Sequence, residues 1–295
     1  MDYILQIHNI SKSYGPVRAV HKLSLSIAAG NVFGILGPNG SGKTTTLAII
    51  TGVIHPDEGE YSWFNQHPAA PLRKKIGSLI EVPNFYPYLS LAANLKIVTL
   101  IKNAHPSEID RVLKIAGLSD RKDSKYYTLS LGMKQRLALA SVLIGDPVVL
   151  VLDEPANGLD PEGIAEVRNI ILREAERKKT IILASHILDE VEKVCTHVAV
   201  LKEGISIAQG SVHELLAAED PVVISADNLK ALEEEIIRSG MSVSVNMENN
   251  DLVIVLKKEY KAKDINEFAC RKGYVLSKLY TRKKSLESQF LELVK

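Results

Sequence analysis

The stretch GPNGSGKTTT, residues Gly37–Thr46, decides how this sequence is interpreted. It matches the pattern G-x-x-x-x-G-K-[ST], between an apolar segment at 31–36 that predicts a strand and a segment at 44–54 that predicts a helix. Glycines in this setting let backbone N–H groups surround phosphate oxygens, and Lys43 reaches the β- and γ-phosphates of a nucleotide. The Thr44 hydroxyl suits Mg²⁺. The predicted nucleotide-binding residues are Gly37, Pro38, Asn39, Gly40, Ser41, Gly42, Lys43, Thr44 and Thr45.

A second motif, VVLVLDEP at Val148–Pro155, supplies acidic partners for this loop. Its continuous apolar run is typical of a strand buried on both faces of a parallel sheet. Asp153 at the strand end would hold the Mg²⁺ from its second side, because a hard cation prefers oxygen ligands. Glu154 beside it can act as the general base on the attacking water. We therefore expect hydrolysis of the bound triphosphate.

A third stretch, TLSLGMKQRLALA at 128–140, opens a predicted helix with a Ser-Leu-Gly turn. Its unpaired backbone N–H groups suit a phosphate, yet the chain already has a phosphate-binding loop about ninety residues earlier. For both to bind one nucleotide within one chain, the helical insertion would have to fold back across the sheet. The simpler hypothesis is that Ser130 and Gly132 contact the nucleotide of a second copy, so that ATP joins a head-to-tail dimer.

The order of predicted elements indicates an α/β fold with a second, smaller domain. Buried strands alternate with helices up to about residue 218, and a mostly helical subdomain is predicted at about 83–144. Residues 219–295 begin a new pattern, β-α-β-β-α-β, which is that of a small ferredoxin-like α+β domain. Its first helix is expected to present Ile237 on its apolar face, and its last helix is expected at Ser285–Leu293.

Composition narrows the class of protein. Lys and Arg number 36 against 35 Asp and Glu, and this near-neutrality argues against a partner that is a nucleic acid. No apolar run approaches the roughly eighteen residues of a membrane span, and the first residues lack the layout of a secretory signal. We expect a cytoplasmic protein that acts at a membrane only by docking onto another protein.

Four motifs in order, GPNGSGKTT, LSLGMKQR, LVLDEPANGLDP and ASHIL, resemble those of an ATP-binding cassette (ABC) nucleotide-binding domain. The resemblance covers about residues 1–215. It implies a P-loop core with an antiparallel β subdomain and an inserted helical subdomain. It also implies two composite ATP sites in a dimer, most simply a homodimer, and a separate membrane permease at the inner face of the membrane.

The resemblance assigns further roles, position by position. Tyr14 would stack on the adenine, although a tyrosine of the core is the alternative. Ser130 and Gly132 would contact the γ-phosphate across the dimer, and Asp160 lies in the loop that joins the two sites. His186 would hold the γ-phosphate and orient the water.

The sequence departs from the family pattern at three positions. In the motif LSLGMKQR, Leu131 and Met133 stand where Gly and Gln are usual, while the backbone N–H donors at Ser130 and Gly132 remain. Glu81 stands where the family has a Gln that senses Mg²⁺ and the water. A carboxylate there can coordinate Mg²⁺, but it adds negative charge beside a triphosphate, so its partner groups must differ; the alternative is that Glu81 is a tolerated surface carboxylate. With this Glu the chain resembles the bacitracin and lantibiotic self-protection subgroup and other ABC-2-type exporters.

Three functions therefore compete. The first is the ATPase subunit of an ABC exporter, and the segment Pro83–Ser90 (PNFYPYLS) would then either fill the core or receive a short helix of the permease. The second is a soluble ABC ATPase that acts on ribosomes or nucleic acid, which usually carries two cassettes or a long coiled coil. The third is a small-molecule kinase, which leaves the Ser-Leu-Gly turn and His186 without a role. The first is the hypothesis that accounts for every motif.

Overall fold

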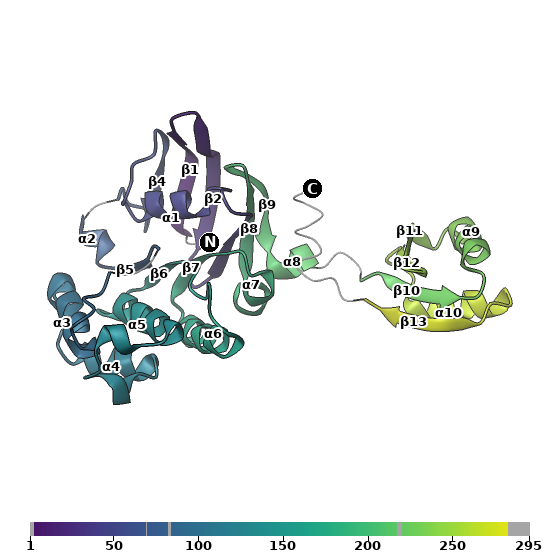
Figure 1. Ribbon diagram of the computed structural model, residues 1–295. Helices are drawn as coiled ribbons and strands as arrows, with labels where there is room; N and C mark the ends of the chain where they lie inside the picture. Colours follow the sequence, from purple (N-terminus) through teal and green to yellow (C-terminus); the bar gives the residue numbers. More distant parts are fainter. Residues whose placement is uncertain (1–2, 69, 82–83, 217–219, 283–295) are drawn as a thin grey trace. The chain divides into compact units, whose positions relative to one another are not determined.

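The computed structural model describes residues 3–68, 70–81, 84–216 and 220–282. The chain divides into two compact units, one ending at Val212 and one beginning at His213, which are considered separately (Figure 1).

A six-stranded sheet forms the centre of the first unit. Its strand order is β5-β6-β7-β3-β8-β9, and neighbours are parallel except for β9, which runs antiparallel to β8. Strands β3, β6 and β7 are buried at every residue, as their continuous apolar sequences predict. The strands are β3 (Val32–Leu36), β5 (Ile76–Leu79), β6 (Val149–Asp153), β7 (Thr180–Ser185), β8 (His197–Lys202) and β9 (Ile205–Ser211).

A second, antiparallel sheet has the order β2-β1-β4. Its strands are β1 (Tyr3–Tyr14), β2 (Val17–Ala28) and β4 (Glu58–Trp63). Apolar side chains of this sheet, of helix α1 (Lys43–Ile50) and of the larger sheet form one continuous buried cluster. Helix α1 is therefore packed between the two sheets, which places its first turn, the start of the predicted nucleotide site, against rigid elements.

The helical subdomain contains α3 (Leu91–Lys102), α4 (Glu108–Ile115) and α5 (Leu131–Leu143), close to the ranges that the sequence predicts. Helices α5, α6 (Pro161–Glu176) and α7 (Leu188–Val194) contact strands β5, β7 and β3, respectively. Side-chain oxygens of Ser90, Ser130 and Asp160 cap α3, α5 and α6. Short helices occur at α2 (Ala70–Arg73) and α8 (Val212–Leu216), with 3₁₀ turns at Ser119–Arg121 and Tyr126–Thr128.

The carboxyl end of α5 is held by two cations of the same subdomain. The Lys102 ammonium donates to the carbonyls of Val142 and Ile144 at 2.9 and 3.0 Å. The Arg111 guanidinium donates to the carbonyl of Leu143 at 2.8 Å. Cations at a helix C-terminus satisfy orphan carbonyls and oppose the negative end of the helix dipole. This end of α5 is thus fixed, and with it the direction in which its first turn points.

The second unit is a small α+β domain. Its sheet order, β11-β12-β10-β13, is antiparallel throughout, and the helices at 229–239 and 262–271 share one core with the sheet. Chain order and strand order confirm the ferredoxin-like fold. The elements are β10 (Val222–Ala226), α9 (Leu229–Ser239), β11 (Ser242–Glu248), β12 (Asp251–Leu256), α10 (Ala262–Arg271) and β13 (Leu276–Thr281).

One detail of the second unit differs from the prediction. Leu232 and Ile236 of α9 are buried, but Ile237 is 56% exposed, because the buried stripe of this helix is narrower than its run of apolar residues. The helix predicted at Ser285–Leu293 lies outside the described residues.

Candidate functional site

Four neighbouring parallel strands bring most of the predicted site residues to one edge of the sheet. The loop 37–42 follows β3, His186 follows β7, Asp153 ends β6, and Glu81 comes two residues after β5. Parallel strands in the order β5-β6-β7-β3 end on the same side, where α/β proteins bind their ligands. A cavity of about 340 Å³ lies there, lined by Thr44, Glu81, Asp153 and Glu154 together with Tyr126, Leu131, Lys134, Gln135 and Asn157.

The loop 37–42 has a backbone that only small residues allow. Gly42 has φ +99°, and a Cβ added there would lie 2.3 Å from the carbonyl oxygen of Ala19. Lys43 is buried, and its ammonium donates to the carbonyls of Gly37 and Pro38 at 2.8 and 3.2 Å. The loop thus folds tightly around the lysine that the sequence assigns to the phosphates.

Other loop residues lie where the motif predicts. Asn39, Gly40 and Ser41 form the turn before α1, and Thr44 and Thr45 are in its first helical turn. The Ser41 hydroxyl is buried and has no hydrogen-bond partner among the described residues. A buried polar atom without a partner in a loop built for phosphate is consistent with a ligand that supplies the partner.

Asp153 and Thr44 have the chemistry of a Mg²⁺ site. Thr44 and Asp153 line the same cavity, and Asp153 Oδ1 is buried without a hydrogen-bond partner in the described part of the chain. Burial raises the pKa of Asp153, and the charges of Glu154 and Glu81 add to this rise, while Thr44 and Lys43 oppose it. A divalent cation would remove this unfavourable burial of negative charge, so the residues fit the metal.

Glu154 and His186 form a directly bonded pair. Glu154 Oε2 lies 2.8 Å from His186 Nδ1 and accepts the His186 backbone N–H at 3.3 Å, and Glu154 Oε1 lies 3.7 Å from the Lys43 ammonium. Glu154 has φ +46°, a conformation that costs a non-glycine residue about 1–3 kcal/mol and that clusters at functional sites. The arrangement can orient a carboxylate and an imidazole toward one water molecule.

Glu81 reaches the same cavity from β5. It also has a left-handed backbone, with φ +58°. No group of three His, Cys, Asp or Glu side chains with the spacing of a metal cage occurs among the described residues. Glu81 therefore lines the site without forming a preassembled carboxylate cluster with Asp153 and Glu154.

Ser130, Gly132 and Asp160 lie together in a different cleft, of about 460 Å³. Its other lining residues are those of the same turn, of α6 and of the loop before it, and none of them is in loop 37–42. The Ser130 hydroxyl accepts the Met133 backbone N–H at 3.3 Å, which leaves its own O–H free to donate. Ser130 and Gly132 thus share no cavity with Thr44, Asp153 and Glu154 of the same chain, although Leu131 between them lines both clefts.

Tyr14 is not among the residues that line either cleft. It ends β1, its side chain is 51% exposed, and the Lys12 ammonium lies 6.0 Å from its ring centroid. The alternative of a core tyrosine is therefore wrong, and the ring is open for stacking.

Sequence reasoning missed four residues of the first cavity: Tyr126, Lys134, Gln135 and Asn157. Lys134 and Gln135 belong to the first turns of α5, directly after the Ser-Leu-Gly turn. Their position early in the predicted helix was visible in the sequence. The sequence does not indicate, however, that this part of the helix lies in the same cavity as Glu81.

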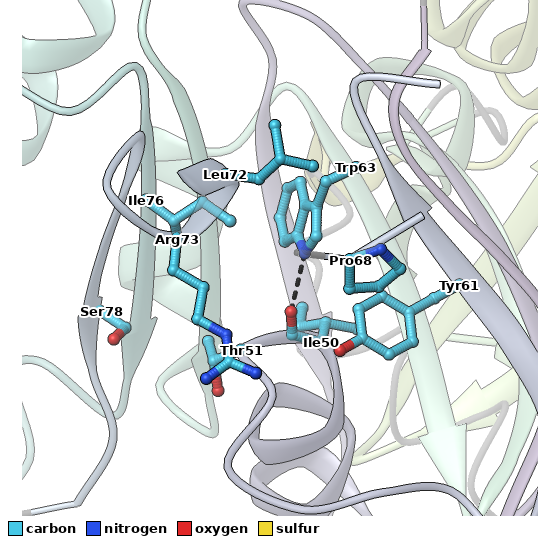
Figure 2. A pocket seen from close by; sticks show the side chains of 9 residues that line it. All are labelled: Ile50, Thr51, Tyr61, Trp63, Pro68, Leu72, Arg73, Ile76 and Ser78. Atoms are coloured by element: carbon cyan, nitrogen blue, oxygen red, sulfur yellow. Dashed lines mark hydrogen bonds between the residues drawn. The ribbon is translucent and has the colours of Figure 1, made fainter. Parts of the chain in front are cut away.

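A further cavity in the first unit, of about 140 Å³, contains none of the predicted site residues (Figure 2). Tyr61, Trp63, Leu72 and Arg73 surround it, and the Trp63 indole N–H donates to the carbonyl of Ile50 at 2.7 Å. This hydrogen bond, dashed in Figure 2, fixes the last turn of α1. The residues around this cavity therefore support helix α1 at the end opposite the nucleotide loop.

The aromatic segment before α3 is exposed. Tyr86 and Tyr88 are 61% and 79% exposed, and the Tyr88 ring lies tilted against that of Tyr127, with the centroids 5.9 Å apart. Of the two roles that the sequence left open for this segment, filling the core is wrong for these two side chains. Pro83 lies outside the described residues.

Comparisons with known proteins identify the family. Residues 20–157 match the model of the ABC transporter family. The chain is 29% identical over its whole length to the bacitracin transport ATP-binding protein BcrA of Enterococcus faecalis, covering 97% of that protein. It is 39% identical to the lantibiotic transport ATP-binding protein SrtF of Streptococcus pyogenes, over 68% of this chain and 88% of that one.

A solved structure extends the comparison. A dimeric ATP-binding cassette, MJ0796, bound to ADP and Pi in a post-hydrolysis state, superposes with a TM-score of 0.64 at 25% identity. The superposition covers 70% of this chain and 98% of that one. The chain belongs to the ABC transporter family, as an ATP-binding subunit with ATPase activity coupled to transport.

None of the helices in the described part of the chain combines the length and hydropathy that a membrane crossing requires.

Proposed function

We propose that this chain is the Mg²⁺-dependent ATPase subunit of an exporter, working as a homodimer on a separate membrane permease at the inner face of the membrane. The separation of the two clefts carries this proposal. Thr44, Asp153 and Glu154 line one, while Ser130 and Gly132 line the other. Each chain thus has two complementary halves of a site, and a head-to-tail pair of copies would complete both.

Within such a composite site each residue has a defined task. Loop 37–42 and Lys43 bind the phosphates, and Thr44 and Asp153 hold the Mg²⁺, which neutralises phosphate charge when bound. Glu154 accepts a proton from the attacking water, because its Oε2 is fixed by His186 at 2.8 Å. His186 orients that water. Glu81, Tyr14 and Asp160 keep the roles that the family resemblance assigns to them, as proposals.

The permease would contact the exposed aromatic surface before α3. Tyr86, Tyr88 and Tyr127 expose 61%, 79% and 59% of their side chains. Monomeric proteins rarely leave clustered aromatic side chains in water unless they form an interaction site. An amphipathic helix of the permease would cover them, and ATP-driven closure of the dimer would move that helix. We expect no nucleic-acid partner.

The relatives suggest the class of cargo. BcrA and SrtF are named for transport of bacitracin and of a lantibiotic, and BcrA matches this chain over its second unit as well as its first. We infer that the exporter removes a peptide antibiotic.

The dimer is tested with the variant Glu154→Gln, which slows hydrolysis and retains the charge of Asp153. With ATP and Mg²⁺ it should elute as a dimer in size-exclusion chromatography, and with ADP as a monomer. The added variant Ser130→Arg places a long cation in the second cleft and should prevent the dimer. A monomer of Glu154→Gln with saturating ATP would contradict the homodimer.

The permease is tested by purifying the tagged chain from its native membranes in mild detergent. A polytopic membrane protein at near-equal amount supports the exporter. Ribosomal or DNA-associated proteins without a permease would contradict it. In cells, loss of the chain should increase sensitivity to peptide antibiotics, and an unchanged sensitivity to all of them would contradict the inferred cargo.

A further inference from the structure

The cavity at the sheet edge contains an unusual amount of negative charge. Three carboxylates line it, Glu81, Asp153 and Glu154. Of the cations nearby, the Lys43 ammonium is bound to its own loop and lies 3.7 Å from Glu154. A nucleoside triphosphate adds several further negative charges. Glu154 pairs with Lys43, whereas Glu81 and Asp153 have no ion pair with a cation among the described residues; Asp153 is buried and Glu81 is exposed.

A positive charge from the helical subdomain faces this cavity. Lys134 lines it, is half-buried, and extends from the first turns of α5. Its ammonium lies 5.4 Å from the centroid of the Tyr126 ring, and no carboxylate is within 4 Å of it in the part of the chain that the structure describes. An aromatic ring attracts a cation without neutralising it, so the Lys134 charge can still act on a neighbouring carboxylate.

The backbone of Glu81 is consistent with a functional carboxylate. Its φ of +58° is costly for any residue with a Cβ, and the strain is tolerated directly after a strand that is hydrogen-bonded to β6. Glu81, two residues after β5, lines the cavity that Lys134 also lines. Both side chains are long and flexible, so residues that share one cavity of this size can meet.

We propose that Lys134 is a positioning residue that neutralises and orients Glu81, so that the carboxylate can stand beside bound nucleotide without repelling it. Lys134 acts through Glu81 and not on the phosphates. The pair links the turn that contains Ser130 and Gly132 to the end of β5, and so joins the helical subdomain to the catalytic cavity. This inference rests on the proposed nucleotide site.

A double-mutant cycle separates this role from its alternatives. The affinity of the full chain for a fluorescent ATP analogue is measured with EDTA, so that no metal contributes. Lys134→Met should weaken binding about three- to tenfold in the chain that has Glu81, the effect of one charge across a partly solvated cavity. In the Glu81→Gln chain the same substitution should change binding by less than about twofold. Lys134→Arg should restore the affinity.

The matched control removes a lysine of the same subdomain that does not line the cavity. Lys114 on α4 is exposed, and Lys114→Met should leave the affinity within about twofold. An equal loss for Lys134→Met in both backgrounds would mean direct contact with the nucleotide, and would overturn the proposal. No loss in either background would also overturn it. If the unmodified chain bound no nucleotide, the proposed site itself would fail.

Discussion

Lys179 offers the sharpest test of how the catalytic edge is held in place. It precedes β7, and its ammonium lies 2.7 Å from Glu174 Oε2 and 2.6 Å from Asp146 Oδ1. The Lys179 and Glu174 side chains are 6% and 2% exposed, while Asp146 is 49% exposed. The group ties the amino ends of β6 and β7 together, and the opposite ends of these strands carry Glu154 and His186.

The variant Lys179→Met removes the cation and leaves Glu174 buried. Breaking a buried ion pair costs about 3–5 kcal/mol, because one charge remains without its partner. The Arg177 guanidinium still lies 3.0 Å from Glu174 Oε2, so the lower end of this range, about 3 kcal/mol, is expected. In urea this should lower the unfolding midpoint by about 1 M.

The assay is specific for the first unit. The chain has one tryptophan, Trp63, which is 2% exposed, so its fluorescence follows unfolding of the first unit alone. The double variant Lys179→Met with Glu174→Met should recover at least half of the loss, because apolar replacement of a buried pair is often neutral. Lys193→Met, which breaks a solvent-exposed ion pair with Asp189, should leave the midpoint almost unchanged. A Lys179→Met midpoint within about 0.2 M of the unmodified chain would refute the reasoning.

Three further predictions concern single contacts. Gly42→Ala should weaken ATP binding by more than about tenfold, because its Cβ would meet the Ala19 carbonyl, whereas Gly40→Ala meets no atom within 4 Å and should weaken it less; equal losses would contradict this. Trp63→Phe should cost about 2 kcal/mol of unfolding free energy, since it loses one buried hydrogen bond and leaves a cavity, which circular dichroism in urea would measure. Burial alone would raise the pKa of Asp146, but hydrogen bonds from two cations outweigh it and lower that pKa. Its folded pKa is thus below the unfolded value, so Asp146→Asn should cost about 0.5–1 kcal/mol at pH 7, and the difference should begin to decline as the pH falls below about 4 and vanish only below the lower folded pKa; a constant difference would contradict this.

The sequence predicts the buried strands well and the exposed ones poorly, for a physical reason. β3, β6 and β7 are covered on both faces, so selection for burial leaves an apolar run that is visible in the sequence. Strand β4, EGEYSW, has three exposed residues and one buried residue, and it is a strand because it pairs with β1. Pairing with a distant partner leaves no local signal, and the sequence analysis did not identify β4.

The residues of the candidate site likewise fall into those that the sequence predicts and those that it does not. Loop 37–42, Asp153 and Glu154 were predictable, because phosphate and metal binding require particular residues at fixed local spacing. Lys134 was not, because its place in the cavity depends on how α5 is anchored at its far end by Lys102 and Arg111. Residues that bind phosphate or metal form short motifs that a sequence shows directly. The position of the helical subdomain relative to the sheet depends on contacts that lie far from the site.

Leu131 shows what that distinction means for function. In the sequence it is a departure from the family motif, a large apolar residue where glycine is usual. In the structure it is 57% exposed and lines both clefts, the one with Thr44 and Asp153 and the one with Ser130 and Asp160. Its methyl carbon Cδ2 also lies 3.6 Å from the place where Gly158 would carry a Cβ, so the loop leading to α6 is packed against it. One apolar side chain therefore forms a wall common to the nucleotide cavity of its own chain and to the cleft proposed for a partner's nucleotide. Glycine would remove this shared wall, and the exposed leucine offers an apolar surface that the proposed second copy would cover with a gain from the release of water.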